Sequence, residues 1–300
     1  MADGRPADRS PLRFFVLVFA LAIPFWLLQP LTEGMSDVLP MRLPTSAAMF
    51  VAPFVAALIL TRADRRPGGT RRLLRHSVSR QGIDRRRWYL PALLIMPVLM
   101  FLSYAVARAM GDAVPAPRFD PTYVLVSVAL FAVAGLMEEV GWMGYLGGVL
   151  QQRRNALWAA LLLGTVWAVW HIVPYAQAGH SVRWITWQCV LTVALRVIIF
   201  WLYNNNAGSV LLASLFHASI NVSDALYPVD GSAYNPVISG AVIVLAAAAI
   251  AFLWGPTSLT RFRYSSSRPD AARVDTGRPD TAGRDTARLP GPDRSGQRSA

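Results

Sequence analysis

Two adjacent glutamates, Glu138 and Glu139, stand in an otherwise apolar stretch of the chain from Phe131 to Leu150. Ionisable side chains inside a membrane-spanning segment are energetically costly, and they commonly mark functional sites. The alternative is that a helix ends here and that the pair lies at the water interface. Other polar residues within apolar segments separate these two interpretations.

Two of the four histidines, His171 and His217, also lie in apolar segments. His217 precedes Asn221 by four residues, and Trp167 precedes His171 by the same spacing. Residues four apart share one face of a helix, so each pair is expected to point in one direction. A single histidine in an apolar helix is usually a packed core residue, whereas this pattern favours a polar site within the membrane.

The depths of these residues are predicted from two polar turns, at residues 151–155 and 204–206. At a rise of about 1.5 Å per residue, Glu138 and His171 lie roughly 22–26 Å from the first turn. His217 and Asn221 lie roughly 16–23 Å from the second turn by the same rise. Three helices are therefore expected to place these side chains at similar depth.

The chemistry that such a cluster supports is acyl transfer, with peptide hydrolysis as the natural case. A carboxylate and a histidine beside buried water can take a proton from that water. A second histidine and an amide can donate hydrogen bonds to a developing oxyanion. Zinc bound by His171, His217 and a glutamate is an alternative, but the chain has no HExxH motif and no tight ligand pair. We therefore expect no cofactor.

The elements that position the cluster are predicted to be transmembrane helices, because a bilayer core needs roughly 20 apolar residues per helix. The fold class is an all-α, polytopic bundle of about eight spans. The predicted spans are 13–32, 46–61, 89–110, 122–150, 156–174, 184–203, the weaker 207–221, and 236–256. The first span is long and lacks a small-residue cleavage site after it, so we expect an uncleaved helix rather than a signal peptide.

Composition agrees with an integral membrane protein: 54% of the residues are hydrophobic and only 15% are charged. The net charge of +12 does not indicate nucleic-acid binding, because the arginines flank apolar segments and no binding fold accompanies them. Placing the N-terminus inside puts 24 arginines on the inner side and three outside. The positive-inside rule then predicts that both termini are cytosolic, in a bacterial plasma membrane.

Four regions follow from these patterns. Residues 1–120 form the N-terminal helices with a basic cytosolic loop at 62–88, residues 121–225 form the core, residues 226–256 the last helix, and residues 257–300 a disordered tail. The loop at 62–88 is expected to lie on the inner lipid surface as a solvated topology signal; a lipid-binding helix is the alternative. The single cysteine, Cys189, excludes an internal disulfide.

Three motifs in this core together resemble the CPBP family, the CAAX protease and bacteriocin-processing (ABI) family of intramembrane glutamic endopeptidases. The first is Glu138-Glu139 with the following segment to Leu146, the second is Trp167 with His171, and the third is His217 with Asn221. Trp167 stands where the family usually has phenylalanine. The resemblance covers roughly residues 120–225.

The resemblance implies a role for each site residue. Glu138 would activate water with help from His171, Glu139 would orient the site, and His217 and Asn221 would stabilise the oxyanion. The implied partners are the lipid bilayer and a membrane-bound peptide or protein substrate, such as a prenylated CAAX-like protein. No metal is required by the glutamic mechanism.

One departure from the family pattern is Met143, which stands where the family has an arginine that could pair with Glu139. Arg196 lies about 12 Å from the turn at 204–206, near the depth of Met143, so it could supply the missing charge. The competing expectation, which we favour, is that Arg196 snorkels to the inner surface.

Met143 also keeps alternative functions open. A non-catalytic membrane protein, such as a bacteriocin self-immunity factor or a scaffold, could retain the motifs for packing. A transporter or channel could use the glutamates as a cation relay, although the chain shows no paired inverted halves and no second acidic span. An intramembrane peptidase remains the favoured hypothesis.

Overall fold

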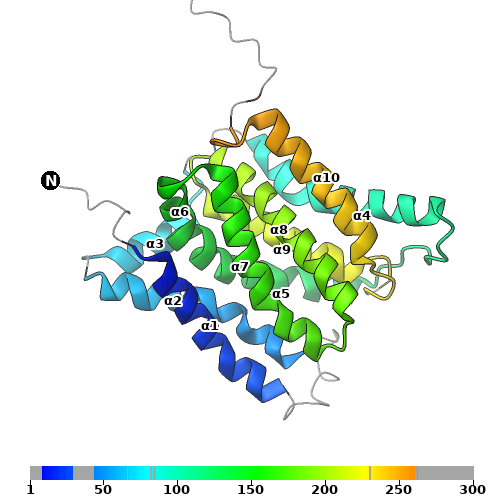
Figure 1. The fold of residues 1–300 in the computed structure, drawn as a ribbon, viewed down its shortest axis with the longest axis horizontal. Helices are drawn as coiled ribbons and strands as arrows, with labels where there is room; N and C mark the ends of the chain where they lie inside the picture. The colour runs from blue at the N-terminus through cyan, green and yellow to red at the C-terminus, as the bar shows by residue number, and fades with distance from the viewer. Residues whose placement is uncertain are drawn as a thin grey trace, which may run out of the picture. The chain divides into compact units, whose positions relative to one another are not determined.

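The computed structural model describes residues 9–29, 44–65, 67–81, 83, 86–229, 231–260 and 262, which belong to one compact unit. All regular elements within these residues are helical (Figure 1). Seven helices or helix runs are long and apolar enough to cross a membrane, and α9, Val210–Leu226, is a shorter apolar helix. The protein is therefore a polytopic helical membrane protein, as its sequence predicts.

The helices coincide with the predicted spans to within a few residues. In chain order they are α1 Pro11–Leu28, the 3₁₀ helix η4 Thr45–Phe50, α2 Val51–Ala63, α3 Gly69–Ser77, the 3₁₀ helix η5 Arg86–Trp88, α4 Tyr89–Ala109, α5 Pro121–Glu139, the π-helix η6 Val140–Gly147, α6 Gly148–Arg153, α7 Ala156–Gln177, α8 Val182–Asn204, α9, and α10 Pro236–Trp254. The predicted span 207–221 shows the largest shift, because α9 begins at Val210 and continues to Leu226.

The four helices that carry the polar residues begin at side-chain caps, which satisfy backbone N–H groups that the first helical turn leaves free. Asp120 caps α5, Asn155 caps α7, Ser181 caps α8 and Ser209 caps α9. These caps fix where each helix starts, and so they fix the depth of every residue that follows.

The helix ends predicted to share one membrane face lie together. Arg153 at the end of α6 donates to the backbone oxygen of Arg9, and Arg9 pairs with Asp64 after α2 at 3.6 Å. Asn204 at the end of α8 donates to the Ser258 carbonyl beyond α10. We call this arginine-rich face the basic end of the bundle.

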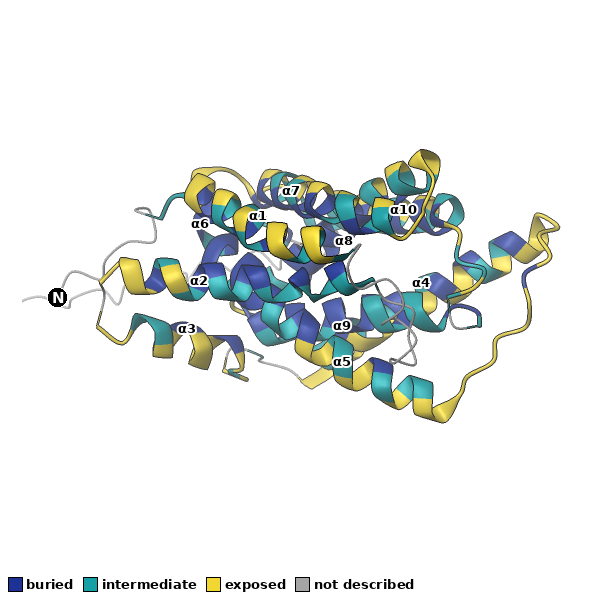
Figure 2. Ribbon diagram, turned by 90° about the horizontal axis from the view of Figure 1, so that it is seen from below, coloured by how far each residue is buried: buried dark blue, intermediate teal, exposed yellow. Residues whose placement is uncertain are grey.

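Burial is concentrated in the centre of the bundle, where α8 runs between α7, α9 and α10 (Figure 2). In the most apolar 18-residue segment of α8, 67% is buried, against 17% in the corresponding segment of α1 at the periphery. A lipid-facing helix needs apolar side chains all round, so helix packing rather than hydropathy distinguishes the central from the peripheral helices.

The predicted span 122–150 is one continuous run that changes geometry directly after the two glutamates. Residues 140–147 form a π-helix, a rare local widening that is frequent at functional sites. Gly141 allows close approach here, because a Cβ atom at this position would collide with the Pro53 carbonyl of α2. The run therefore combines a change of helix geometry with close packing against α2.

Two surface segments differ from expectation. The basic loop 62–88 is not simply solvated: it contains α3, whose Leu73 and Ser77 are buried against η6. At the start of the segment 257–300, which is expected to be disordered, Leu259 is fully buried and its carbonyl accepts a hydrogen bond from Asn205. Apart from 257–260 and 262, residues 257–300 lie outside the described part of the chain.

Candidate active site

Glu139, the last residue of α5, is fully buried and has both carboxylate oxygens occupied. Arg196 of α8 donates from Nη1 to Oε1 and Oε2, each at 2.8 Å. The Nδ1 atom of His217 on α9 lies 2.8 Å from Oε1. Because the carboxylate accepts, Nδ1 carries the hydrogen in this contact. Glu139 thus ties three helices together at their most buried point.

Arg196 is also fully buried, so the snorkelling interpretation is wrong. Its guanidinium Cζ lies 4.0 Å from the ring centroid of Trp167, a cation–π contact that is stronger when both partners are desolvated. Two of its nitrogens, Nε and Nη2, have no hydrogen-bond partner among the described residues. Among the described residues, the Glu139 carboxylate and the Trp167 ring are the groups that stabilise this cation.

Glu138 has a different environment from its neighbour. Its Oε2 accepts hydrogen bonds from the indole N–H groups of Trp167 at 2.9 Å and Trp142 at 3.2 Å. Its Oε1 faces the Nε2 atom of His217 at 3.9 Å, beyond hydrogen-bond distance. The Glu138 side chain retains 6% exposure, whereas that of Glu139 has none. Among the described residues, Oε1 of Glu138 accepts no hydrogen bond, whereas both oxygens of Glu139 are engaged.

His171 on α7 adjoins the cluster through Trp167. Its Nδ1 lies 2.8 Å from the Trp167 carbonyl, so Nδ1 carries the hydrogen and a neutral ring has its lone pair on Nε2. The ring is half-buried and stacks on Tyr175. A neutral histidine in this tautomer can accept a proton at Nε2.

Asn221 is half-buried and lies one turn beyond His217 on the same face of α9. No hydrogen bond joins its side chain to the cluster within the described part of the chain. The structure thus brings Glu138, Glu139, His217 and Arg196 into direct contact and places His171 and Asn221 at the margin.

Trp142 is a site residue that sequence reasoning missed. It precedes the expected arginine position, now Met143, and it donates to Glu138 from the next turn of the same helix. The four-residue spacing from Glu138 was an available signal, since it is the spacing that pairs the other motif residues.

A bound metal ion needs several ligand side chains that converge on one point. Among the described residues, no group of three or more His, Cys, Asp or Glu side chains is arranged to hold one. The zinc alternative needs one of the two glutamates, and Glu139 already has both oxygens engaged by Arg196.

Comparison with known proteins connects this geometry to a family. Residues 120–223 match the family model described as Type II CAAX prenyl endopeptidase Rce1-like. Over 171 residues the chain is 28% identical to CAAX prenyl protease 2 of Methanococcus maripaludis (strain DSM 14266). The central region of this chain is thus similar to the CAAX proteases of the CPBP family. The alignment covers 52% of this chain and 62% of that relative, so the chain spans less than two thirds of the curated relative it matches.

The region that matches the Rce1-like family model includes every residue of the site. Glu138, Glu139, His171, His217 and Asn221 all fall within residues 120–223, as does Arg196. The region that matches the family model therefore contains the whole buried cluster.

Proposed function

We propose that this protein is an intramembrane endopeptidase of the glutamic type. It would hydrolyse a peptide bond of a membrane-associated substrate, such as a prenylated CAAX-like protein. The observation that carries the proposal is the asymmetry of the glutamates: Arg196 and His217 hold Glu139, while Glu138 keeps a free, slightly exposed oxygen.

The first step is the attack of water on the scissile carbonyl carbon. Glu138 Oε1 takes a proton from the water as its oxygen bonds to that carbon, and the carbonyl π electrons move to the oxygen. His171 would assist by accepting a hydrogen bond from the same water at Nε2, the nitrogen that keeps its lone pair when Nδ1 is engaged by the Trp167 carbonyl. A positioned base of this kind contributes roughly 10²–10⁴-fold to a rate.

The oxyanion that forms needs donors. His217 Nε2 faces Glu138 Oε1, so a proton held by Glu138 can reach it after a small movement. The resulting imidazolium is stabilised by Glu139 through Nδ1 and donates from Nε2, and the Asn221 amide supplies a second donor. When the intermediate collapses, the carbon–nitrogen bond breaks and the proton passes to the leaving amine.

Arg196 has a positioning role in this proposal. It supplies the cation that Met143 cannot, and it keeps Glu139 ionised and oriented toward His217. This pair is the reason that we favour catalysis over an immunity or scaffold function. We place both termini in the cytosol, because the basic end carries most of the arginines that the structure describes.

The test compares peptide termini in membranes that contain the wild type, Glu138→Gln, or the control Asp112→Asn, at equal expression. Asp112 is an exposed carboxylate outside the cluster. New termini should appear with the wild type and with Asp112→Asn, and be absent with Glu138→Gln. Identical termini in all three, with all proteins folded, would reject the peptidase. Cleavage of other peptides but not of a prenylated CAAX peptide would correct only the substrate.

A further inference from the structure

Helix α3 is basic on its exposed side and apolar where it meets the bundle. Arg71, Arg72 and Arg75 are exposed, while Leu73 and Ser77 are buried. The Ser77 hydroxyl donates to the Leu73 carbonyl, which removes a polar group from the buried side. A helix with this division is suited to the boundary between lipid headgroups and acyl chains.

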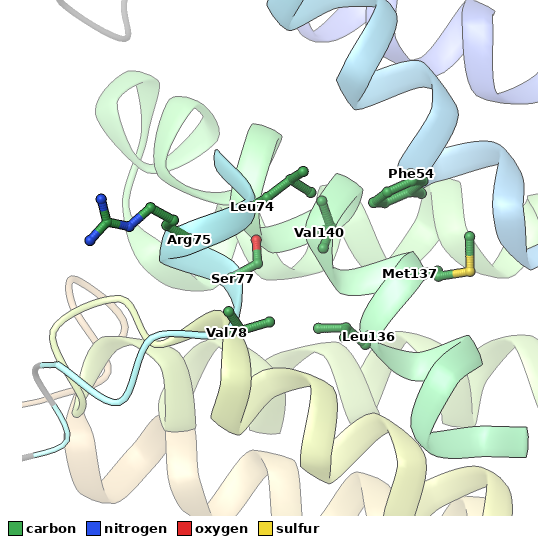
Figure 3. A pocket seen from close by; sticks show the side chains of 8 residues that line it. All are labelled: Phe54, Leu74, Arg75, Ser77, Val78, Leu136, Met137 and Val140. Carbon is green, nitrogen blue, oxygen red and sulfur yellow. The ribbon is translucent and has the colours of Figure 1, made fainter. Parts of the chain in front are cut away.

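An apolar groove of about 460 Å³ lies between α3, α2 and the junction of α5 with η6. Its lining residues are Phe54, Leu74, Arg75, Ser77, Val78, Leu136, Met137 and Val140. In Figure 3 the apolar side chains converge on one space, whereas the Arg75 guanidinium points away from it. The groove therefore has a cationic margin and an apolar interior, and its volume is in the range of small-molecule sites.

The charge at this margin is not compensated within the described part of the chain. No ion pair there involves Arg71, Arg72 or Arg75, and the nearby carboxylate of Asp64 is paired with Arg9. The Arg72 guanidinium reaches only the Pro67 carbonyl. The complementary ligand is an anion that also carries a long apolar chain.

We propose that α3 and this groove bind an anionic phospholipid. The phosphate would lie against Arg71 and Arg75, which share a face of α3, and one acyl chain would occupy the space between Leu74, Val78 and Met137. Leu74 and Val78 retain 36% and 56% exposure, so the groove is open to a lipid that approaches from the bilayer.

The bound lipid would also brace the segment that follows the glutamates. A Cβ atom placed on Gly144 of η6 would lie 3.2 Å from the Ser77 hydroxyl and 3.3 Å from Leu73, so α3 packs directly on the π-helix. A lipid that holds α3 in place should therefore stabilise the fold as well as bind to it.

The experiment uses the full chain, purified in neutral detergent and delipidated. Binding of phosphatidylglycerol and of phosphatidylcholine with the same acyl chains is measured by native mass spectrometry and by the shift in thermal unfolding. The charge variant is Arg71→Gln/Arg75→Gln, and the matched control is Arg86→Gln/Arg87→Gln, which removes two exposed arginines at the same end. The groove variant is Val78→Trp, with Val98→Trp on the lipid-facing side of α4 as its control.

We expect phosphatidylglycerol to bind the wild type more tightly than phosphatidylcholine and to raise its unfolding temperature. The α3 charge variant should weaken that binding about tenfold or more, and the control pair about twofold or less. Val78→Trp retains all charges and should also weaken phosphatidylglycerol binding. This variant therefore tests the proposal if the charge variant does not fold.

Three results would overturn the proposal. The first is equal binding of the two lipids by the wild type, and the second is equal loss in both arginine pairs. The third is a dimer that Val78→Trp disrupts without a change in phosphatidylglycerol binding, which would assign the groove to a second copy of the chain.

Discussion

The guanidinium of Arg196 holds both oxygens of Glu139 from a single nitrogen, and neither side chain has any solvent exposure. Arg196 is 57 residues away in the chain and comes from α8, whereas the CPBP pattern expects the cation four residues after Glu139. The charge is therefore retained while its origin moves from the same helix to a neighbouring one.

Removing the cation should strongly destabilise the fold. Arg196→Met leaves the buried Glu139 carboxylate without its cation and with His217 as its remaining partner, and breaking a buried ion pair in this way costs about 3–5 kcal/mol. We expect a lower unfolding temperature in detergent and loss of peptidase activity.

A swap of the two positions tests the same pair more sharply. Met143 is fully buried one turn from Glu139, so Arg196→Met/Met143→Arg returns a cation to the family position. The double variant should recover part of the stability that the single variant loses. Simple addition of the two single effects would contradict the compensation.

Removal of the two indole N–H groups that donate to Glu138 should lower the rate of cleavage and change the unfolding temperature little. Trp142→Phe and Trp167→Phe each remove one N–H group and keep an aromatic ring, including the ring that faces Arg196. We expect each single change to lower kcat less than tenfold, and the double change to lower it about 10–100-fold, as Oε2 loses both donors. Steady-state kinetics with unchanged unfolding temperature would support this. Trp167→Leu is the contrasting variant, since it should also destabilise the protein.

Gly141 should not tolerate a side chain. Gly141→Ala would place a Cβ atom against the Pro53 backbone, and overpacking of this kind costs about 1–3 kcal/mol. Gly148→Ala is the matched control, because its Cβ would meet only the Tyr203 hydroxyl at 4.0 Å. The unfolding temperature should fall for Gly141→Ala alone. Equal effects of the two substitutions would mean that the contact between α2 and η6 is not tight.

Metal removal should leave the activity unchanged, because the proposed mechanism uses only side chains. Purified protein treated with EDTA or phenanthroline is expected to retain its cleavage rate, and elemental analysis to find no stoichiometric zinc. Activity that is lost with chelator and restored by zinc would instead return His171, His217 and a glutamate to the zinc interpretation.

The orientation can be tested by cysteine labelling in a Cys189→Ser background. Arg80→Cys and Arg183→Cys each place a single thiol at an exposed position. Arg80 lies between α3 and η5, and Arg183 lies in the first turn of α8. In intact cells, an impermeant maleimide should label Arg183→Cys, and Arg80→Cys only after permeabilisation. The reverse labelling pattern would invert the proposed topology.

The helices and their order were predictable because the signals that specify them are local. Runs of apolar residues set the length of each span, and caps such as Asn155 and Ser209 set where helices begin. The rise per residue then predicted that Glu138, His171 and His217 lie at similar depth. The family motifs added roles for these residues.

Tertiary structure alone decided which side chains meet at that depth. Hydropathy gives the position of a residue along the bilayer normal, but not the direction in which it points or the helix that it faces. The π-helix after Glu139 and the close approach at Gly141 set those directions, and they depend on contacts between distant segments. For this reason only the family resemblance distinguished the two glutamates, and the sequence favoured an Arg196 side chain that reaches the inner surface. Packing buried Arg196 against Glu139 and left Glu138 with a free oxygen.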